Sequence, residues 1–247
     1  NINKTAIILG ASGEIGGDVA MAFVKENYNV CLHYFKNEKK INDLIKILEN
    51  KKSKIFKFKA DIVNKKSTDL MMKEIYNKYG RIDIIVNCTA AKLITIKHRK
   101  SKWKNFEEQI ENQVKGTFNI INSSYDYFKF RDGGKIINIL SQAIDSPAND
   151  LHHYTVGKSA LFAYIKSVAA ELAAHGIIIN SVSPGLTNTD QTANLPEGLK
   201  LLSIAKTPLK RLCSKEDIVN AILYLASNKA NFLCGETIRI NGGQTIV

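Results

Sequence analysis

The feature that most constrains the fold is an alternation of short β-branched runs with longer amphipathic stretches along the whole chain. Seven runs predict strands, at 5–9, 29–34, 54–59, 82–87, 135–140, 177–182 and 236–240. Six stretches between them predict helices, at about 14–27, 37–51, 64–79, 102–129, 153–175 and 214–228. Because each right-handed crossover returns its helix to the sheet, this alternation predicts parallel strands. The expected fold is therefore α/β: a doubly wound, Rossmann-like parallel sheet of about seven strands with helices on both faces.

Length and composition favour one domain over residues 1–247. The chain has 45% apolar residues, 23% charged residues and only 4 prolines, so it can bury a large core. No apolar run approaches the roughly 18 residues of a membrane span, and no basic and apolar leader opens the sequence. We expect a soluble, cytoplasmic protein without membrane contact. The segment from Pro184 to Pro208 is the one long region that reads as irregular, and its part at 187–208 is a candidate substrate lid.

The net charge of +12 comes from two stretches of the chain. Residues 36–59 and 92–104 each carry a surplus of six positive charges, and the second stretch has no acidic residue. The surplus consists mainly of lysines, and no aromatic residues interleave them as in nucleic-acid motifs. Solvated lysine faces or a phosphate-bearing small ligand explain this charge better than nucleic acid, which we do not expect as a partner.

The cysteine and histidine patterns predict no metal site. The four cysteines are scattered and none belongs to a Cys-x-x-Cys pair, so we expect reduced thiols. His152 and His153 are adjacent but have no third ligand at metal-binding spacing, and we expect them to line a substrate entrance.

A glycine-rich turn follows the first predicted strand, at residues 10–17, and opens the first helix. Glycines there let the backbone approach a pyrophosphate and aim amide groups and the positive end of a helix at it. Such a turn can also be purely structural, but its place at the first strand–helix junction favours a dinucleotide.

The end of the second predicted strand selects between the nicotinamide cofactors. An acidic residue there would bind a ribose 2′-hydroxyl, whereas a cation accommodates a 2′-phosphate. The sequence His33-Tyr34-Phe35-Lys36-Asn37 has no acid, which predicts a preference for NADP(H), with NAD(H) possible. Lys36 is expected nearest the phosphate, with Lys39 and Lys40 in support.

A candidate catalytic group lies on the predicted helix that follows the fifth strand. Tyr154 and Lys158 are one helical turn apart, and Ser141 lies thirteen residues before Tyr154 at the end of a strand. A phenol is a poor acid or base near neutrality unless a cation lowers its pKa, and Lys158 would be that cation. A carbonyl held between the two hydroxyl groups could be protonated as a hydride arrives.

Over essentially its whole length, the chain resembles the short-chain dehydrogenase/reductase family. The motifs that carry this resemblance are the glycine-rich turn, Asp61-Ile62, Asn87-Cys88-Thr89-Ala90, Asn112 in its helix, the Ser–Tyr–Lys set and Pro184-Gly185. The resemblance implies that Tyr154 is the general acid and base, that Lys158 lowers its pKa and binds the nicotinamide ribose, and that Ser141 polarises the substrate. It also implies that Asn112 holds a water in a proton relay. The implied cofactor-binding residues are Gly10, Ser12, Gly13, Ile15, Gly16, Tyr34, Lys36, Asp61, Ile62, Asn87, Ala90, Tyr154, Lys158, Pro184, Gly185, Thr187 and Thr189.

Three departures from the family pattern lie beside the expected cofactor. Glu14 replaces a glycine, and we expect its carboxylate to point away from the phosphates. Gly13 stands where NADP-preferring relatives often have a basic residue. Cys88-Thr89-Ala90 lacks the second Asn and the final Gly of the motif. None of these changes removes a catalytic group.

Within the family, the chain is most similar to the β-ketoacyl carrier-protein reductases, in its second-strand exit, its lid and its ending at 235–243. We therefore expect a carbonyl reductase that acts on a ketone, with a 3-oxoacyl thioester as the expected substrate, and by resemblance a homotetramer. Asp132 and His175 stand where arginines dock the carrier protein in relatives, so the basic residues at 92–104 are an alternative receiver of a phosphate-bearing substrate. A sugar, polyol or secondary-metabolite ketone is the alternative substrate, and a catalytically silent cofactor-binding scaffold or sensor is the remote alternative function.

Overall fold

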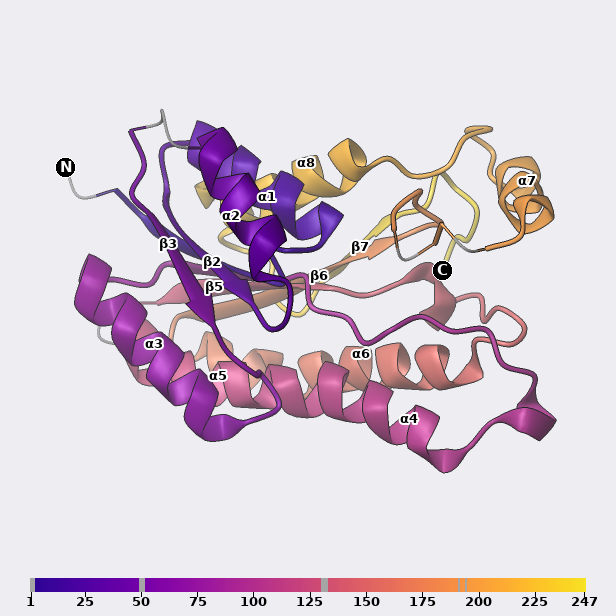
Figure 1. The fold of residues 1–247 in the computed structure, drawn as a ribbon, viewed down its shortest axis with the longest axis horizontal. Coiled ribbons are helices and arrows are strands. Elements are labelled where there is room, and N and C mark those ends of the chain that lie inside the picture. The colour runs from indigo at the N-terminus through magenta and orange to yellow at the C-terminus, as the bar shows by residue number, and fades with distance from the viewer. Residues whose placement is uncertain (1–2, 49–51, 130–132, 191, 194) are drawn as a thin grey trace.

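The computed structural model describes residues 3–48, 52–129, 133–190, 192–193 and 195–247. Over these residues the chain forms one parallel sheet of seven strands in the order β3-β2-β1-β4-β5-β6-β7 (Figure 1). The strands are β1 (Thr5–Leu9), β2 (Asn29–Tyr34), β3 (Ile55–Lys59), β4 (Ile84–Asn87), β5 (Gly134–Ile139), β6 (Ile177–Pro184) and β7 (Thr237–Ile240). The fold is the doubly wound, Rossmann-like sheet that the alternating pattern predicts.

Helices cover both faces of the sheet. They are α1 (Glu14–Lys25), α2 (Glu38–Leu48), α3 (Lys65–Tyr79), α4 (Trp103–Ile110), α5 (Gly116–Lys129), α6 (His152–Ala173), α7 (Glu197–Lys206) and α8 (Lys215–Ala226). Figure 1 shows α1, α2 and α8 above the sheet and α3, α4, α5 and α6 below it. Each layer has its own buried core, because both faces of the central strands are apolar.

Local sequence sets several helix ends. Asn64 accepts a hydrogen bond from the Ser67 amide at the start of α3, and Gly80 ends that helix with a left-handed φ of 70°. At the start of α8, Ser214 and Asp217 form a reciprocal capping box. These caps satisfy the amide groups that a helix start leaves free.

Two predicted boundaries are wrong. The predicted helix at 102–129 is divided into α4, a π-helical turn η2 (Glu111–Lys115) and α5, a break that hydrophobic periodicity does not reveal. The region from Pro184 to Pro208 is not irregular throughout, since it contains α7. No residue of α7 is fully buried, so it lacks the core-facing stripe that signals a helix. The end of the predicted helix at 37–51 lies outside the described residues.

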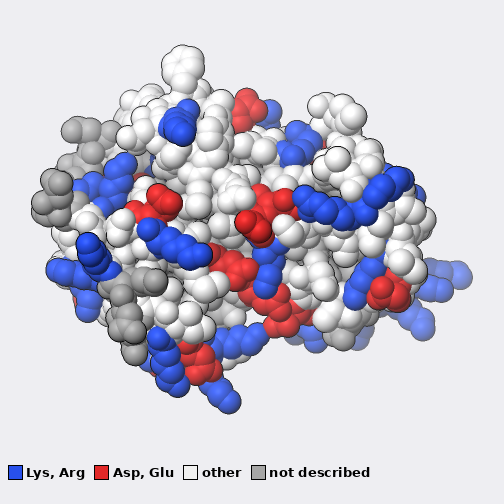
Figure 2. Space-filling model, turned by 90° about the horizontal axis from the view of Figure 1, so that it is seen from above, with Lys and Arg blue, Asp and Glu red and all other residues white. Residues whose placement is uncertain are grey.

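The surface charge is mixed on the face formed by the upper helix layer. Figure 2 shows Lys and Arg spread over this face, with Asp and Glu between them near its middle. The positive surplus therefore does not form one continuous patch there. Among the helices of the described residues, none is long and apolar enough to cross a membrane.

Candidate active site

The carboxyl ends of the strands carry the candidate site, and the strand order reverses between β1 and β4. Ligands of open α/β sheets bind at such a switch point. The glycine-rich turn lies here. Gly10 has a φ of +72°, and a Cβ on Gly16 would lie 2.3 Å from the Gly10 carbonyl oxygen. The turn therefore needs glycine at both positions, and it leaves the first turn of α1 open to an anion.

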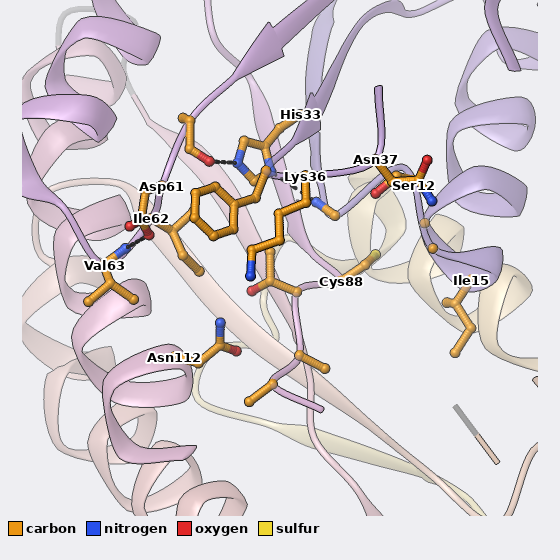
Figure 3. Close-up of a pocket in the computed structure, with 18 of the residues that line it drawn as sticks. Ser12, Ile15, His33, Lys36, Asn37, Asp61, Ile62, Val63, Cys88 and Asn112 are labelled. Carbon is orange, nitrogen blue, oxygen red and sulfur yellow. Dashed lines mark hydrogen bonds between the residues drawn. The ribbon is translucent and has the colours of Figure 1, made fainter. Parts of the chain in front are cut away.

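His33 holds this turn in place, and we did not predict that role from the sequence. Its Nδ1 accepts a hydrogen bond from the Gly10 amide at 3.0 Å, and its Nε2 donates to the Ala60 carbonyl at 3.0 Å (Figure 3). The Ala11 amide donates to the His33 carbonyl oxygen at 2.9 Å. One imidazole thus connects the ends of β1, β2 and β3. Burial lowers the pKa of His33 to about 4, so the ring stays neutral and Nδ1 remains an acceptor.

We predict that His33→Leu weakens cofactor binding about five- to tenfold, because an unpaired buried amide costs about 1–3 kcal/mol and loosens the phosphate turn. His33→Asn should restore most of the affinity, since its amide oxygen can occupy the position of Nδ1. The dissociation constants are measurable by nicotinamide fluorescence. Equal affinity of the Leu and Asn variants would contradict the assignment.

Stability provides a second readout for His33. Its folded-state pKa lies below the unfolded value near 6.5, so the folded chain binds fewer protons between the two values and loses stability as pH falls. Urea unfolding should show about 2 kcal/mol less stability at pH 5 than at pH 7 from this residue alone. The His33→Asn variant should lack that part of the pH dependence.

A cavity of about 590 Å³ lies over the glycine-rich turn. Residues predicted to bind the cofactor that line it are Gly10, Ser12, Gly13, Ile15, Gly16, Lys36, Asp61, Ile62, Ala90 and Thr189. Asn112 also lines it. Tyr34 does not: its phenol is hydrogen-bonded to Glu38 instead, and the neighbouring side chains of His33 and Phe35 line the cavity.

The other predicted cofactor residues support the walls of the cavity. Asn87 is buried at the end of β4 and accepts hydrogen bonds from the Thr89 amide and hydroxyl. At the end of β6, after Pro184, the Gly185 amide donates to the Ile240 carbonyl and the Thr187 hydroxyl donates to the Gly185 carbonyl. These contacts fix the two loops on either side of the cavity.

Charged side chains at the cavity mouth are arranged differently from our expectation. Lys36 extends into the cavity (Figure 3), while Lys40 forms an ion pair with Asp190 at 2.7 Å and is not free to support Lys36. Glu14 lines the cavity, but Lys215 lies 3.3 Å from its carboxylate, which offsets the charge. Lys36 is therefore the cation that points at the cavity from the end of β2.

Ser141, Tyr154 and Lys158 come together at the end of β5 and the start of α6. The Lys158 Nζ lies 6.0 Å from the centre of the Tyr154 ring, on the same face of α6. Burial raises the pKa of Tyr154, and a hydrogen bond with Ser141 opposes this increase. Burial also lowers the pKa of Lys158 to about 7. Burial is thus the largest influence on both groups, and Lys158 is partly charged near neutrality.

The partners of Lys158 also differ from expectation. Its Nζ donates to the Ile139 carbonyl at 2.6 Å and to Gln113 Oε1 at 3.0 Å. Lys158 and Gln113 are each only 2% exposed. Asn112 instead points into the cofactor cavity (Figure 3). Gln113 lies on the π-helical turn, which inserts one extra residue and so changes which side chain faces Lys158. Gln113 is thus a site residue that sequence periodicity could not reveal.

Comparison with known proteins identifies the class to which this fold and site belong. A family model described as Enoyl-(Acyl carrier protein) reductase matches residues 10–245. The chain belongs to the short-chain dehydrogenase/reductase family and is an NAD(P)-dependent oxidoreductase.

Similar proteins cover the chain almost completely. The 3-oxoacyl-[acyl-carrier-protein] reductase FabG of Staphylococcus epidermidis is 31% identical over 98% of this chain and 99% of its own length. The protein of the same name from Buchnera aphidicola is 30% identical, with full coverage of both chains. A solved short-chain dehydrogenase/reductase from Mycobacterium ulcerans has a TM-score of 0.92, with 26% identity over 98% of this chain and 89% of that one. A 7α-hydroxysteroid dehydrogenase complexed with NADH and 7-oxo glycochenodeoxycholic acid shares the fold, with a TM-score of 0.91 and 24% identity over 98% of this chain and 95% of that one.

Proposed function

We propose that the protein is an NADPH-dependent carbonyl reductase whose substrate is a 3-oxoacyl thioester. The observation that carries the proposal is the placement of the Ser141–Tyr154 hydroxyl pair beside Lys158, between the end of β5 and the start of α6. Cys88 links the two parts of the site, since it lines the cavity and is near enough to Lys158 to influence its pKa.

The residues of the cavity fit a nicotinamide dinucleotide. Gly10 and Gly16 form a cradle that a Cβ would fill, and the Oδ1 of Asn112 is buried in the wall without a partner among the described residues. The glycine-rich turn would hold the pyrophosphate, and Asp61 and Ile62 would contact the adenine end. The bound cofactor supplies a hydride to the substrate carbon.

The chain's own side chains orient the substrate carbonyl and supply the proton that its oxygen receives. Ser141 donates a hydrogen bond to the substrate carbonyl oxygen and holds it beside Tyr154. Tyr154 then transfers its hydroxyl proton to that oxygen as the hydride reaches carbon, which gives the secondary alcohol. Lys158, held by Ile139 and Gln113, stabilises the tyrosinate that remains until solvent returns the proton.

We predict that Lys36→Ala weakens NADPH binding about tenfold and leaves NADH binding unchanged, because only NADPH carries the 2′-phosphate that the ammonium contacts. Titration of both cofactors by fluorescence measures the two affinities. Lys39→Ala is the matched control, since Lys39 is an exposed neighbour outside the cavity lining. Equal affinities of the parent protein for NADPH and NADH would contradict the preference itself.

The substrate proposal rests on similarity to the FabG proteins and on the apolar surface of α7. Leu199, Leu201 and Leu202 are about half exposed there, and an acyl chain would cover this apolar surface. We propose that 187–208, with α7 within it, acts as the substrate lid.

A substrate panel tests the proposal. Acetoacetyl thioesters, keto-sugars and a 2-enoyl thioester are offered with NADPH, and turnover is followed at the absorbance of the reduced nicotinamide. We expect fast oxidation of NADPH with the acetoacetyl thioester and not with the other substrates. Turnover of keto-sugars alone would favour the sugar and polyol alternative, and NADPH binding without turnover would favour the scaffold alternative.

We propose further that the protein assembles as a homotetramer through the outer faces of α5 and α6. Phe118 and Val156 are 49% and 42% exposed on these faces, and burial against a second copy would remove that apolar surface from water. Light scattering on the purified protein measures the assembly state.

A further inference from the structure

Six cationic side chains lie between the end of β4 and the first turn of α4: Lys92, Lys97, Arg99, Lys100, Lys102 and Lys104. All are exposed, and none forms an ion pair with another described residue. We name residues 92–104 the cationic segment. Six unpaired like charges on thirteen residues repel one another, and an anionic ligand would relieve that repulsion.

The cationic segment is attached at two points to the elements that build the active site. The Ile96 amide donates to the Asp150 carbonyl at 2.9 Å, just before α6 begins. The Nε2 of Gln109, on α4, donates to the Lys92 carbonyl at 3.1 Å. The segment therefore has a defined position beside the start of the helix that carries Tyr154.

A cluster of aromatic rings joins the cationic segment to that helix. The Trp103 indole stacks on Phe106, with ring centres 5.6 Å apart and planes 15° apart. Phe106 contacts His152 at 5.6 Å, and His98 contacts His152 at 5.4 Å. His152 lies two residues before Tyr154 in α6, so the ring cluster sits at the end of the helix that carries Tyr154.

The same end of the molecule offers surfaces of two kinds. Figure 1 shows α7 and α4 at one end, above and below the level of the sheet. The leucines of α7 provide an apolar surface, and the cationic segment provides positive charge with an indole that is 66% exposed. A substrate with an acyl group and an anionic arm matches both. Of the acidic residues on α4 and the turn after it, Glu108 and Glu111 line the cofactor cavity, and Glu107 follows the segment in the chain.

We infer that the cationic segment binds the phosphate-bearing arm of the thioester substrate, with Arg99, Lys100 and Lys102 as its main contacts. This inference rests on the proposed function. A phosphopantetheine arm is common to coenzyme A thioesters and to thioesters of carrier proteins. The segment would take over the role of the two positions at which relatives carry docking arginines. These positions are 132 and 175 in this chain. The ring of His175 packs against that of Tyr125, with ring centres 5.5 Å apart, and Asp132 lies outside the described residues.

The kinetic test compares two substrates that differ in the anionic arm. Acetoacetyl-coenzyme A carries phosphates, and the acetoacetyl thioester of N-acetylcysteamine does not. In the triple variant Arg99→Gln, Lys100→Gln, Lys102→Gln, kcat/KM for the coenzyme A substrate should fall about tenfold at low ionic strength. The value for the phosphate-free substrate should stay within about twofold of the parent, because local contacts to its acyl part are unchanged.

A matched control variant removes three equally exposed lysines elsewhere: Lys25→Gln, Lys66→Gln, Lys73→Gln. It changes the net charge by the same amount and should affect neither substrate. Added salt should lower kcat/KM of the parent for acetoacetyl-coenzyme A and have little effect on the triple variant. Acetoacetyl-carrier protein is a third substrate, and it distinguishes a coenzyme A arm from a carrier-protein arm. The substrate whose kcat/KM falls more in the triple variant is the one whose arm the segment binds.

Trp103 gives a binding readout that does not depend on turnover, because it is the only tryptophan in the chain. Coenzyme A alone should change its fluorescence, and N-acetylcysteamine should not. In the triple variant, a much higher concentration of coenzyme A should be needed to produce the same change in Trp103 fluorescence.

The outcomes separate this inference from the proposed function. If the parent reduces neither thioester, the proposed function fails. If it reduces both, while the triple variant matches the parent on each and coenzyme A leaves Trp103 unchanged, this inference alone is overturned. An equal loss on both thioesters would also overturn it, because the segment would then support the fold rather than the anionic arm.

Discussion

Replacing Tyr154 with Phe is expected to lower the rate of carbonyl reduction at least about 10³-fold, because the variant lacks the proton that must reach the substrate oxygen. The phenol is hydrogen-bonded to Ser141 and lies next to Lys158, and no other hydroxyl group shares this arrangement among the residues that the structure describes. NADPH binding should be nearly unchanged, since the cavity lining is intact. Single-turnover absorbance measures the chemical step, and fluorescence titration measures binding.

Tyr164→Phe is the matched control, because Tyr164 lies on the same helix and its ring packs against Phe118 instead of the site. It should reduce substrate at the parent rate. A Tyr154→Phe variant that kept more than about a tenth of the parent rate would mean that another group donates the proton, and the proposed mechanism would then be wrong.

The second large effect concerns Gln113 and the pH dependence of the reaction. Burial holds the pKa of Lys158 at about 7, and the charged form is the one that stabilises the tyrosinate. In the parent, kcat/KM for reduction should therefore be constant at acidic pH and fall as pH rises through about 7. Gln113 Oε1 accepts a hydrogen bond from the ammonium group and so favours the charged form.

Gln113→Leu should move this falling limb about 1 to 2 pH units lower, because a hydrogen bond to a charged group contributes about 1.5–3 kcal/mol. Gln113→Glu should move it higher, since a carboxylate favours the ammonium still more. Asn112→Leu should leave its position unchanged, whatever it does to cofactor affinity. A purely structural role of Gln113 would lower the rate equally at every pH, and a pH profile of that shape would contradict the assignment.

Sequence reasoning reached the fold because alternation of strand and helix signals leaves few topologies. The bounds of β1 and β2 match the prediction, β5 is shifted by one residue at both ends, and the other strands differ by one or two residues at one end. The glycine-rich turn was also readable, since its positions require a residue without a side chain. The Ser141, Tyr154 and Lys158 roles came from resemblance as well as from spacing, and their placement supports the proposed reaction without testing it.

The remaining features depend on contacts between residues far apart in the chain. His33 reads as an ordinary strand residue, and only the packing of three strand ends shows that its two ring nitrogens are both used. The pairing of Lys40 with Asp190 joins residues 150 positions apart. Neither contact leaves a periodic signal.

The sequence by itself determined the parallel sheet, the phosphate turn and the residue types available for proton transfer, because these depend on local propensity and on the spacing of neighbours. Only the tertiary structure decided which amide side chain faces Lys158, and that Lys40 is paired with Asp190 instead of supporting Lys36. A π-helical turn changes the direction of a side chain, and a distant carboxylate pairs with a cation, without changing the local pattern of apolar and polar residues.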